Sequence, residues 1–113
     1  MKKIYLIFNN NDFEPVLINV CEEDLINDYK LLMGRAIENK KDKLSIWINE
    51  QWDKGNEVLF HELQSGLDQS ELNYYTKYWQ KQFSKLLKGK CASETSEEGK
   101  KMILGFKNFY NSK

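Results

Sequence analysis

Lysines and tyrosines at helical spacing are the residues of this sequence best suited to bind another molecule. Between residues 68 and 90, at 100° per residue, four lysines and two tyrosines fall on or beside one arc of a helix, opposite an apolar arc. The predicted basic face consists of Lys77, Lys81, Lys85, Lys88, Tyr74 and Tyr78. Ammonium groups interleaved with aromatic rings are typical of surfaces that bind nucleic acid or an acidic protein. A merely solvated helix face has the same pattern, so both interpretations stay open.

A second candidate surface combines tryptophan with carboxylates in residues 44–63. Trp47 lies opposite the apolar side of the strand predicted there, and Trp52 lies at the turn that follows. Exposed tryptophans are frequent anchors of protein interfaces, and a patch of one charge speeds association with the opposite charge. The predicted aromatic–acidic surface consists of Trp47, Trp52, Glu50, Asp53 and Glu57. A further layer packed over the tryptophans, or a solvated acidic face, would explain the same residues.

Sequence signatures of catalysis are absent. The chain has no GxxxxGK[ST], GxGxxG, HExxH, GxSxG or CxxC motif, and its acidic residues lack the spacing of a calcium-binding loop. We expect the single histidine, His61, to be half-buried or exposed on a strand, Cys21 to lie in the core, and Cys91 to be an exposed thiol. We therefore predict no catalytic residue, no metal and no cofactor.

Composition predicts one packed domain over residues 1–113, because 41% of the residues are apolar, 13% are aromatic and one is proline. The net charge of zero hides an asymmetry: residues 1–75 hold 8 basic and 14 acidic side chains, and residues 76–113 hold 9 and 3. The two cysteines have no metal or redox spacing, and the apolar run near the N-terminus is too short for a signal peptide or a membrane span. A cytoplasmic protein that does not enter a membrane is expected.

The first elements are predicted from a change of period. Residues 4–8 and 16–20 are β-branched and aromatic runs separated by NNNDFEP, which predicts an N-terminal β-hairpin. Residues 22–39 then show a wide apolar arc at helical spacing, with acidic residues in the first turn, where the helix dipole favours negative charge. A helix is expected there.

The stretch 44–63 fits two patterns. Leu44, Ile46 and Ile48 alternate with other residues, and DKGN separates them from a second alternating run, which predicts a second β-hairpin. Residues 57–63, followed by glycine at 66, equally fit a short helix, because short apolar runs do not separate the two periods. We prefer the hairpin.

Two further helices are predicted at residues 69–88 and 96–111. Asp68 and Glu71 have capping-box spacing before the first of them, and Gly89 follows it as a stop. The expected fold is α+β, in the order ββαββαα, with a mainly antiparallel sheet packed on one face by three helices. The side chains expected in the core are Leu32, Trp79, Phe83, Leu86 and Phe106.

These features predict a small cytoplasmic protein-interaction module rather than an enzyme. Its concrete form would be an inhibitor or immunity-type protein that covers the active surface of another protein. The alternative is a nucleic-acid-binding accessory protein that uses the basic face of residues 69–88. A second alternative is a small enzyme with no recognisable motif.

Overall fold

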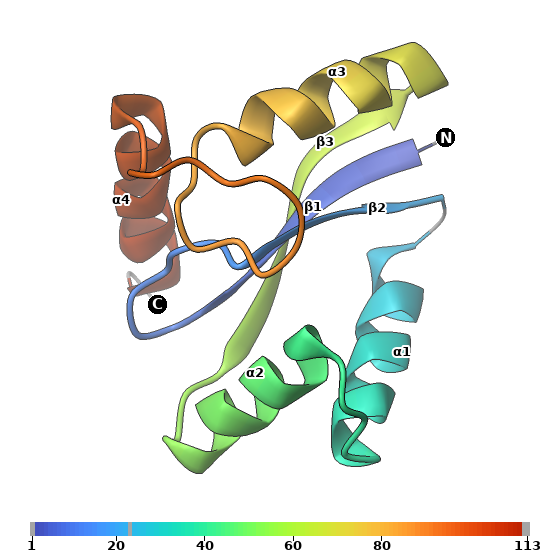
Figure 1. The fold of residues 1–113 in the computed structure, drawn as a ribbon, viewed down its shortest axis with the longest axis vertical. Helices are drawn as coiled ribbons and strands as arrows, with labels where there is room; N and C mark the ends of the chain where they lie inside the picture. Colours follow the sequence, from blue (N-terminus) through green and yellow to red (C-terminus); the bar gives the residue numbers. More distant parts are fainter. Residues whose placement is uncertain (1, 23, 112–113) are drawn as a thin grey trace.

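The computed structural model describes residues 2–22 and 24–111 and confirms an α+β fold. The elements in chain order are β1 (Lys2–Asn9), β2 (Leu17–Cys21), α1 (Leu25–Ile37), α2 (Lys43–Asp53), β3 (Val58–Leu67), α3 (Gln69–Gln80) and α4 (Glu97–Asn111). In Figure 1 the sheet runs through the middle of the molecule, between α1 and α2 on one side and α3 and α4 on the other.

The sheet is three-stranded and antiparallel, with β1 in the centre of the order β2-β1-β3. The predicted N-terminal hairpin is therefore confirmed. Residues 4–9 are all buried, without alternation, because helices cover both faces of the sheet. Successive side chains of a strand point to opposite faces, so Tyr5 and Ile7 enter one core cluster while Leu6 and Phe8 enter another. The expectation that helices pack on one face only is wrong.

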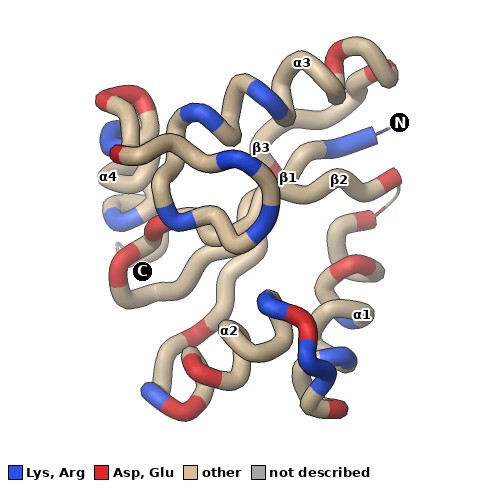
Figure 2. Tube along the Cα trace, viewed as in Figure 1, with Lys and Arg blue, Asp and Glu red and all other residues tan. Residues whose placement is uncertain are grey.

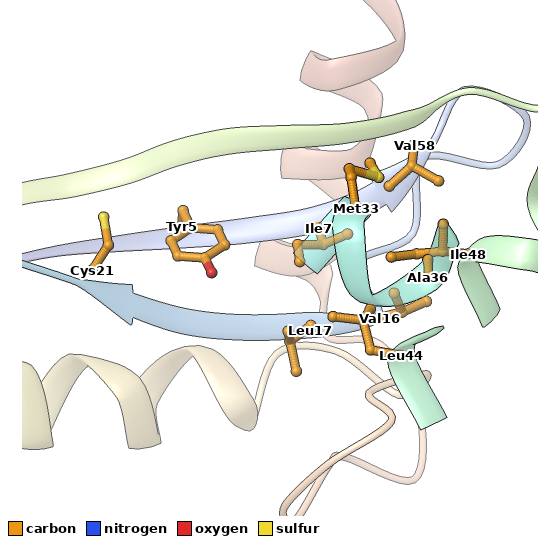
Figure 3. Close-up of a cluster of buried hydrophobic side chains, with 10 residues drawn as sticks. All are labelled: Tyr5, Ile7, Val16, Leu17, Cys21, Met33, Ala36, Leu44, Ile48 and Val58. Atoms are coloured by element: carbon orange, nitrogen blue, oxygen red, sulfur yellow. The ribbon is translucent and has the colours of Figure 1, made fainter. Parts of the chain in front are cut away.

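The first core cluster lies on the side of α1 and α2 and is mostly aliphatic. We call it the aliphatic cluster; it consists of Tyr5, Ile7, Val16, Leu17, Cys21, Met33, Ala36, Leu44, Ile48 and Val58. Figure 3 shows Met33, Ala36 and Ile48 gathered beside Ile7, whereas Tyr5 lies further along the strands.

The second core cluster lies on the side of α3 and α4 and is rich in rings. We call it the aromatic cluster; it consists of Leu6, Phe8, Phe13, Trp79, Phe83, Ile103 and Phe106. The rings of Phe8 and Phe106 stack with their centroids 4.7 Å apart. Because this cluster spans β1, α3 and α4, it holds both helices against the sheet.

The predicted second hairpin is wrong in its first half, since residues 43–53 form α2. Asp42 caps this helix by accepting a hydrogen bond from the backbone N–H of Ser45 at 3.0 Å. Leu44 and Ile48 are buried one turn apart, while Ile46 is 45% exposed, as a helix requires and a strand does not. The second half is a strand, β3, which pairs with β1, so a short helix at 57–63 is also wrong. The observed order is ββααβαα.

The predicted long helix is also too long, because α3 ends at Gln80. Phe83, only 1% exposed, enters the aromatic cluster. The backbone N–H of Leu87 donates to the carbonyl of Val16 at 2.7 Å. These long-range contacts override the local helical pattern, so residues 81–96 form the loop that connects α3 and α4 in Figure 1.

The other helix predictions are close to the structure. The helix expected at 22–39 is α1, which begins at Leu25; residue 23 lies outside the described residues. The helix expected at 96–111 is α4. Burial is confirmed for Trp79, Phe83 and Phe106, whereas Leu32 and Leu86 are only partly buried.

Candidate interaction surface

Four of the six residues of the predicted basic face lie together, three of them on α3 and Lys81 at its C-terminal cap. They line a groove of about 240 Å³ formed by Tyr74, Lys77, Tyr78 and Lys81, which we call the α3 surface. The other two residues do not line it, because they lie on the loop beyond the helix cap. Lys85 Nζ lies 2.7 Å from Glu14 Oε2, and Lys88 is exposed on the loop.

The tyrosine rings form the apolar part of the α3 surface. The rings of Tyr74 and Tyr78 are nearly parallel, with an interplanar angle of 7° and centroids 6.5 Å apart, and Tyr74 is 64% exposed. The Tyr78 hydroxyl donates to the carboxylate of Glu98 in the first turn of α4, and this hydrogen bond raises the pKa of Tyr78. Tyr78 is therefore held in place from α4, while Tyr74 offers its ring to solvent.

The two lysines of the α3 surface supply its charge. Both are exposed, and neither Lys77 nor Lys81 forms an ion pair with a carboxylate of the described residues. Lys85 differs from them, because it forms an ion pair with Glu14. Their ammonium groups are available to a partner.

Helix α3 is anchored at both ends. At its start, the Asp68 carboxylate accepts from the backbone N–H of Glu71 at 2.8 Å, and the Glu71 carboxylate accepts from the N–H of Asp68 at 3.2 Å. The hydrogen bond from the Glu71 N–H lowers the pKa of Asp68. Near its end, the Trp79 indole Nε1 donates to Gln64 Oε1 on β3 at 2.8 Å. The α3 surface thus stands on a fixed helix.

The predicted aromatic–acidic surface is divided by the structure. Trp47 and Glu50 line a polar cavity together with Lys85. Asp53 lines a second hollow beside α2, which Glu50 also borders, and Glu57 lines a third one, next to Tyr29 and Phe60. Trp52 is 38% exposed and lines none of these hollows. Trp47, Glu50 and Asp53 lie on a helix, so their side chains point in several directions. A strand would place them on two faces only.

The residue that sequence reasoning missed is Gln51. It is buried at the position where the apolar spacing of Leu44 and Ile48 would continue, and it lines the same polar cavity as Trp47. A polar side chain on the buried side of a helix indicates a candidate site. This signal can be recognised only if residues 43–53 are predicted to be a helix, and the sequence favoured a hairpin there.

Positive charge extends from α3 into the loop that follows it (Figure 2). Residues 72–93 hold five lysines and no acidic side chain, and Figure 2 shows these lysines along α3 and the loop that follows it.

His61 is half-buried on β3, Cys21 is buried and Cys91 is exposed. Within residues 2–22 and 24–111, no three histidine, cysteine or acidic side chains are grouped to hold a metal ion, and no helix is long and apolar enough to cross a membrane. Comparisons with known protein families, with curated proteins and with solved structures find no match for this chain.

Proposed function

We propose that the protein is a non-catalytic interaction module whose α3 surface binds an acidic segment of a partner protein. The observation that carries this proposal is the grouping of two lysines, both without an ion pair among the described residues, with two parallel tyrosine rings on one anchored helix and its C-terminal cap. Tyrosine is enriched at protein interfaces, where its ring is buried and its hydroxyl stays hydrogen-bonded. The lysines would meet carboxylates of the partner.

The charge of residues 72–93 supports fast association with an acidic protein. Five lysines lie in these residues, which contain no acidic side chain, and although Lys85 is paired with Glu14 the segment keeps an excess of positive charge, which speeds encounter with an oppositely charged surface. In this proposal the module acts in the cytoplasm and works as an inhibitor or immunity-type protein, by covering the surface that it binds. Two cysteines that no disulfide joins are compatible with that location.

A protein partner is preferred over nucleic acid because the α3 surface has few charges. Duplex binding at physiological salt commonly uses about six to ten phosphate contacts, whereas this groove has two lysines. A second candidate function, binding of single-stranded nucleic acid, is favoured by one observation, the parallel rings of Tyr74 and Tyr78. Bases stack on exposed aromatic rings without sequence preference.

The test compares two variants with the same change of charge. Lys77→Gln/Lys81→Gln alters the α3 surface, and Lys101→Gln/Lys107→Gln removes two exposed lysines of α4. Each immobilised protein is used to capture a partner from an extract of the native host, and the association rate of the captured partner is then measured at low and high salt. We expect the α3 variant to associate about tenfold or more slowly at low salt, with a smaller difference at high salt.

Two outcomes would contradict this function. Equal capture and equal rates for all three proteins would exclude the α3 surface as the binding site. If oligothymidylate binds the wild type, and the α3 variant flattens the dependence of its affinity on salt, the second candidate replaces the first.

A further inference from the structure

A polar cavity of about 320 Å³ lies away from the α3 surface. It is half open to solvent and is lined by α2, the connection between β1 and β2, and the loop between α3 and α4; Trp47, Glu50, Gln51 and Lys85 are among its lining residues. Its volume is at the lower end of the range of small-molecule sites. None of the four residues of the α3 surface lines it.

The hydrogen bonds of Asn9 fix the orientation of the amide groups in this cavity. Asn9 Oδ1 accepts from the backbone N–H groups of Asn11 and Asp12, both at 2.9 Å. The other end of the Asn9 amide must therefore be its nitrogen, and this nitrogen donates to Gln51 Oε1 at 2.7 Å. Asn56 Nδ2 also donates to Gln51 Oε1, at 3.0 Å. Both lone pairs of the Gln51 oxygen are thus occupied.

The Gln51 amide nitrogen is left with two N–H donors. Gln51 is 5% exposed, yet Nε2 makes no hydrogen bond with any described residue. Gln51 Nε2 keeps some solvent-accessible surface, and Gln51 lines the polar cavity, so the nitrogen is accessible from that cavity. The Gln51 amide is held by two other side-chain amides, those of Asn9 and Asn56, so its N–H donors are pre-organised for an acceptor.

The surroundings of Gln51 specify the kind of acceptor. A carboxylate makes the strongest hydrogen bond with an amide N–H, and Lys54 at the same cavity has no carboxylate partner among the described residues. Asp12 and Glu50 also line the cavity without an ion pair in the described part of the chain, and they complement an ammonium group. Trp47 and the aliphatic side chains beside it provide an apolar wall.

We infer that this cavity binds a free α-amino acid. Its carboxylate accepts from Gln51 Nε2 and Lys54, its ammonium group lies between Asp12 and Glu50, and its side chain packs on Trp47. This inference does not depend on the proposed function of the α3 surface.

The test is a binding measurement with the twenty free amino acids, each at millimolar concentration. Gln51→Glu keeps the oxygen that Asn9 and Asn56 need but replaces the donor with a second oxygen, which repels a carboxylate. Loss of a hydrogen bond to a charged group corresponds to a fall in affinity of about tenfold or more. We expect that fall in Gln51→Glu, a smaller one in Lys54→Gln, and none in Lys43→Gln, an exposed residue of α2 that does not line the cavity.

NMR of the unmodified protein tests the same contact without a variant, so its result does not depend on whether a variant folds. The side-chain ¹H and ¹⁵N resonances of Gln51 should shift when the amino acid is added, and the amine that lacks the carboxylate should not shift them. The inference is overturned if no amino acid binds, if binding leaves those resonances in place, or if a folded Gln51→Glu variant binds as the wild type does. Lys77→Gln/Lys81→Gln should bind the amino acid normally, which separates this site from the α3 surface.

Discussion

The two faces of the sheet are closed by different kinds of side chain, and each supports a different kind of surface. The aromatic cluster is rich in large rings, and the indole of Trp79 donates a hydrogen bond to Gln64. The aliphatic cluster is made of branched and small side chains. Its main ring, that of Tyr5, donates its hydroxyl to Asp28 at 2.9 Å.

The two clusters hold α3 and α2 in different ways. Rings that stack and donate fix the position of α3, so the residues proposed to bind a partner on its outer side need no adjustment. On the other face, α2 packs through Leu44 and Ile48, and Gln51 follows one turn later at the edge of the cluster. The polar cavity lies at this edge.

Removing the largest ring of the aromatic cluster should have the largest effect. Trp79→Ala should lower the free energy of unfolding by roughly 3–5 kcal/mol, because it leaves a large cavity and frees Gln64. Denaturant melts would measure this loss. Trp79→Phe, which keeps a ring, should lose much less; a loss below about 1 kcal/mol for the alanine variant would mean that the aromatic cluster does not hold α3.

The junction of α3, its loop and α4 depends on a glycine. A Cβ at Gly99 would lie 2.4 Å from the carbonyl oxygen of Gln82, which also accepts from the N–H of Ser96 at 3.0 Å. Gly99→Ala should therefore destabilise the protein by about 1–3 kcal/mol. Gly105, in the same helix, has no neighbour from the described part of the chain within 4 Å of an added Cβ, so Gly105→Ala should stabilise by roughly 0.5–1 kcal/mol. Effects of the same sign in thermal melts would contradict this packing.

Local signals were sufficient to predict much of the fold. The hairpin of β1 and β2, the capping box of Asp68 and Glu71, and helix α4 all follow from residues close in sequence. Prediction failed where a short pattern fits two periods, since Leu44 and Ile48 are compatible with both a strand and a helix. There the deciding residue is Asp42, whose side chain starts α2.

The candidate sites show the same limit. Tyr74, Lys77 and Tyr78 could be grouped from sequence because they lie on one helix. Lys85 could not be excluded, since the end of α3 depends on contacts made far along the chain. The amide pair of the polar cavity joins Asn9 to Gln51, which are 42 residues apart, and no local pattern reports such a contact.

The aliphatic side can be probed at the start of α2. Asp42→Ala removes the carboxylate that accepts the hydrogen bond from the Ser45 N–H. It should lower the free energy of unfolding by about 0.5–2 kcal/mol at neutral pH. The hydrogen bond from the Ser45 N–H lowers the pKa of Asp42 in the folded protein, so this contribution is present above the unfolded pKa of about 3.9 and is lost as the pH falls below it. Melts of both proteins should therefore converge at acid pH; a constant difference would contradict the cap.

The aromatic side should respond to pH in a different range. Burial lowers the pKa of His61, whose ring packs on Phe106 and whose Nδ1 lies 3.0 Å from the Tyr110 hydroxyl. Since the folded state prefers the neutral imidazole, its contribution is complete above the unfolded pKa of about 6.5 and is lost as the pH falls through that value. His61→Phe should remove this loss of stability between neutral and mildly acid pH. An unchanged pH profile in the variant would mean that another group titrates.

The smallest effect on stability is expected on the α3 surface itself. Lys77 and Lys81 are exposed and form no ion pair with the described residues, so Lys77→Gln/Lys81→Gln should change the free energy of unfolding by less than about 0.5 kcal/mol per site. Lys85→Gln provides the contrast, because Lys85 pairs with a partly buried Glu14 at 2.7 Å, and this carboxylate raises the pKa of Lys85. Urea melts should show a larger loss for this single change than for the double variant. If the double variant is the less stable of the two, the lysines of α3 support the fold, and a loss of partner binding on their replacement could no longer be assigned to the charge of the surface.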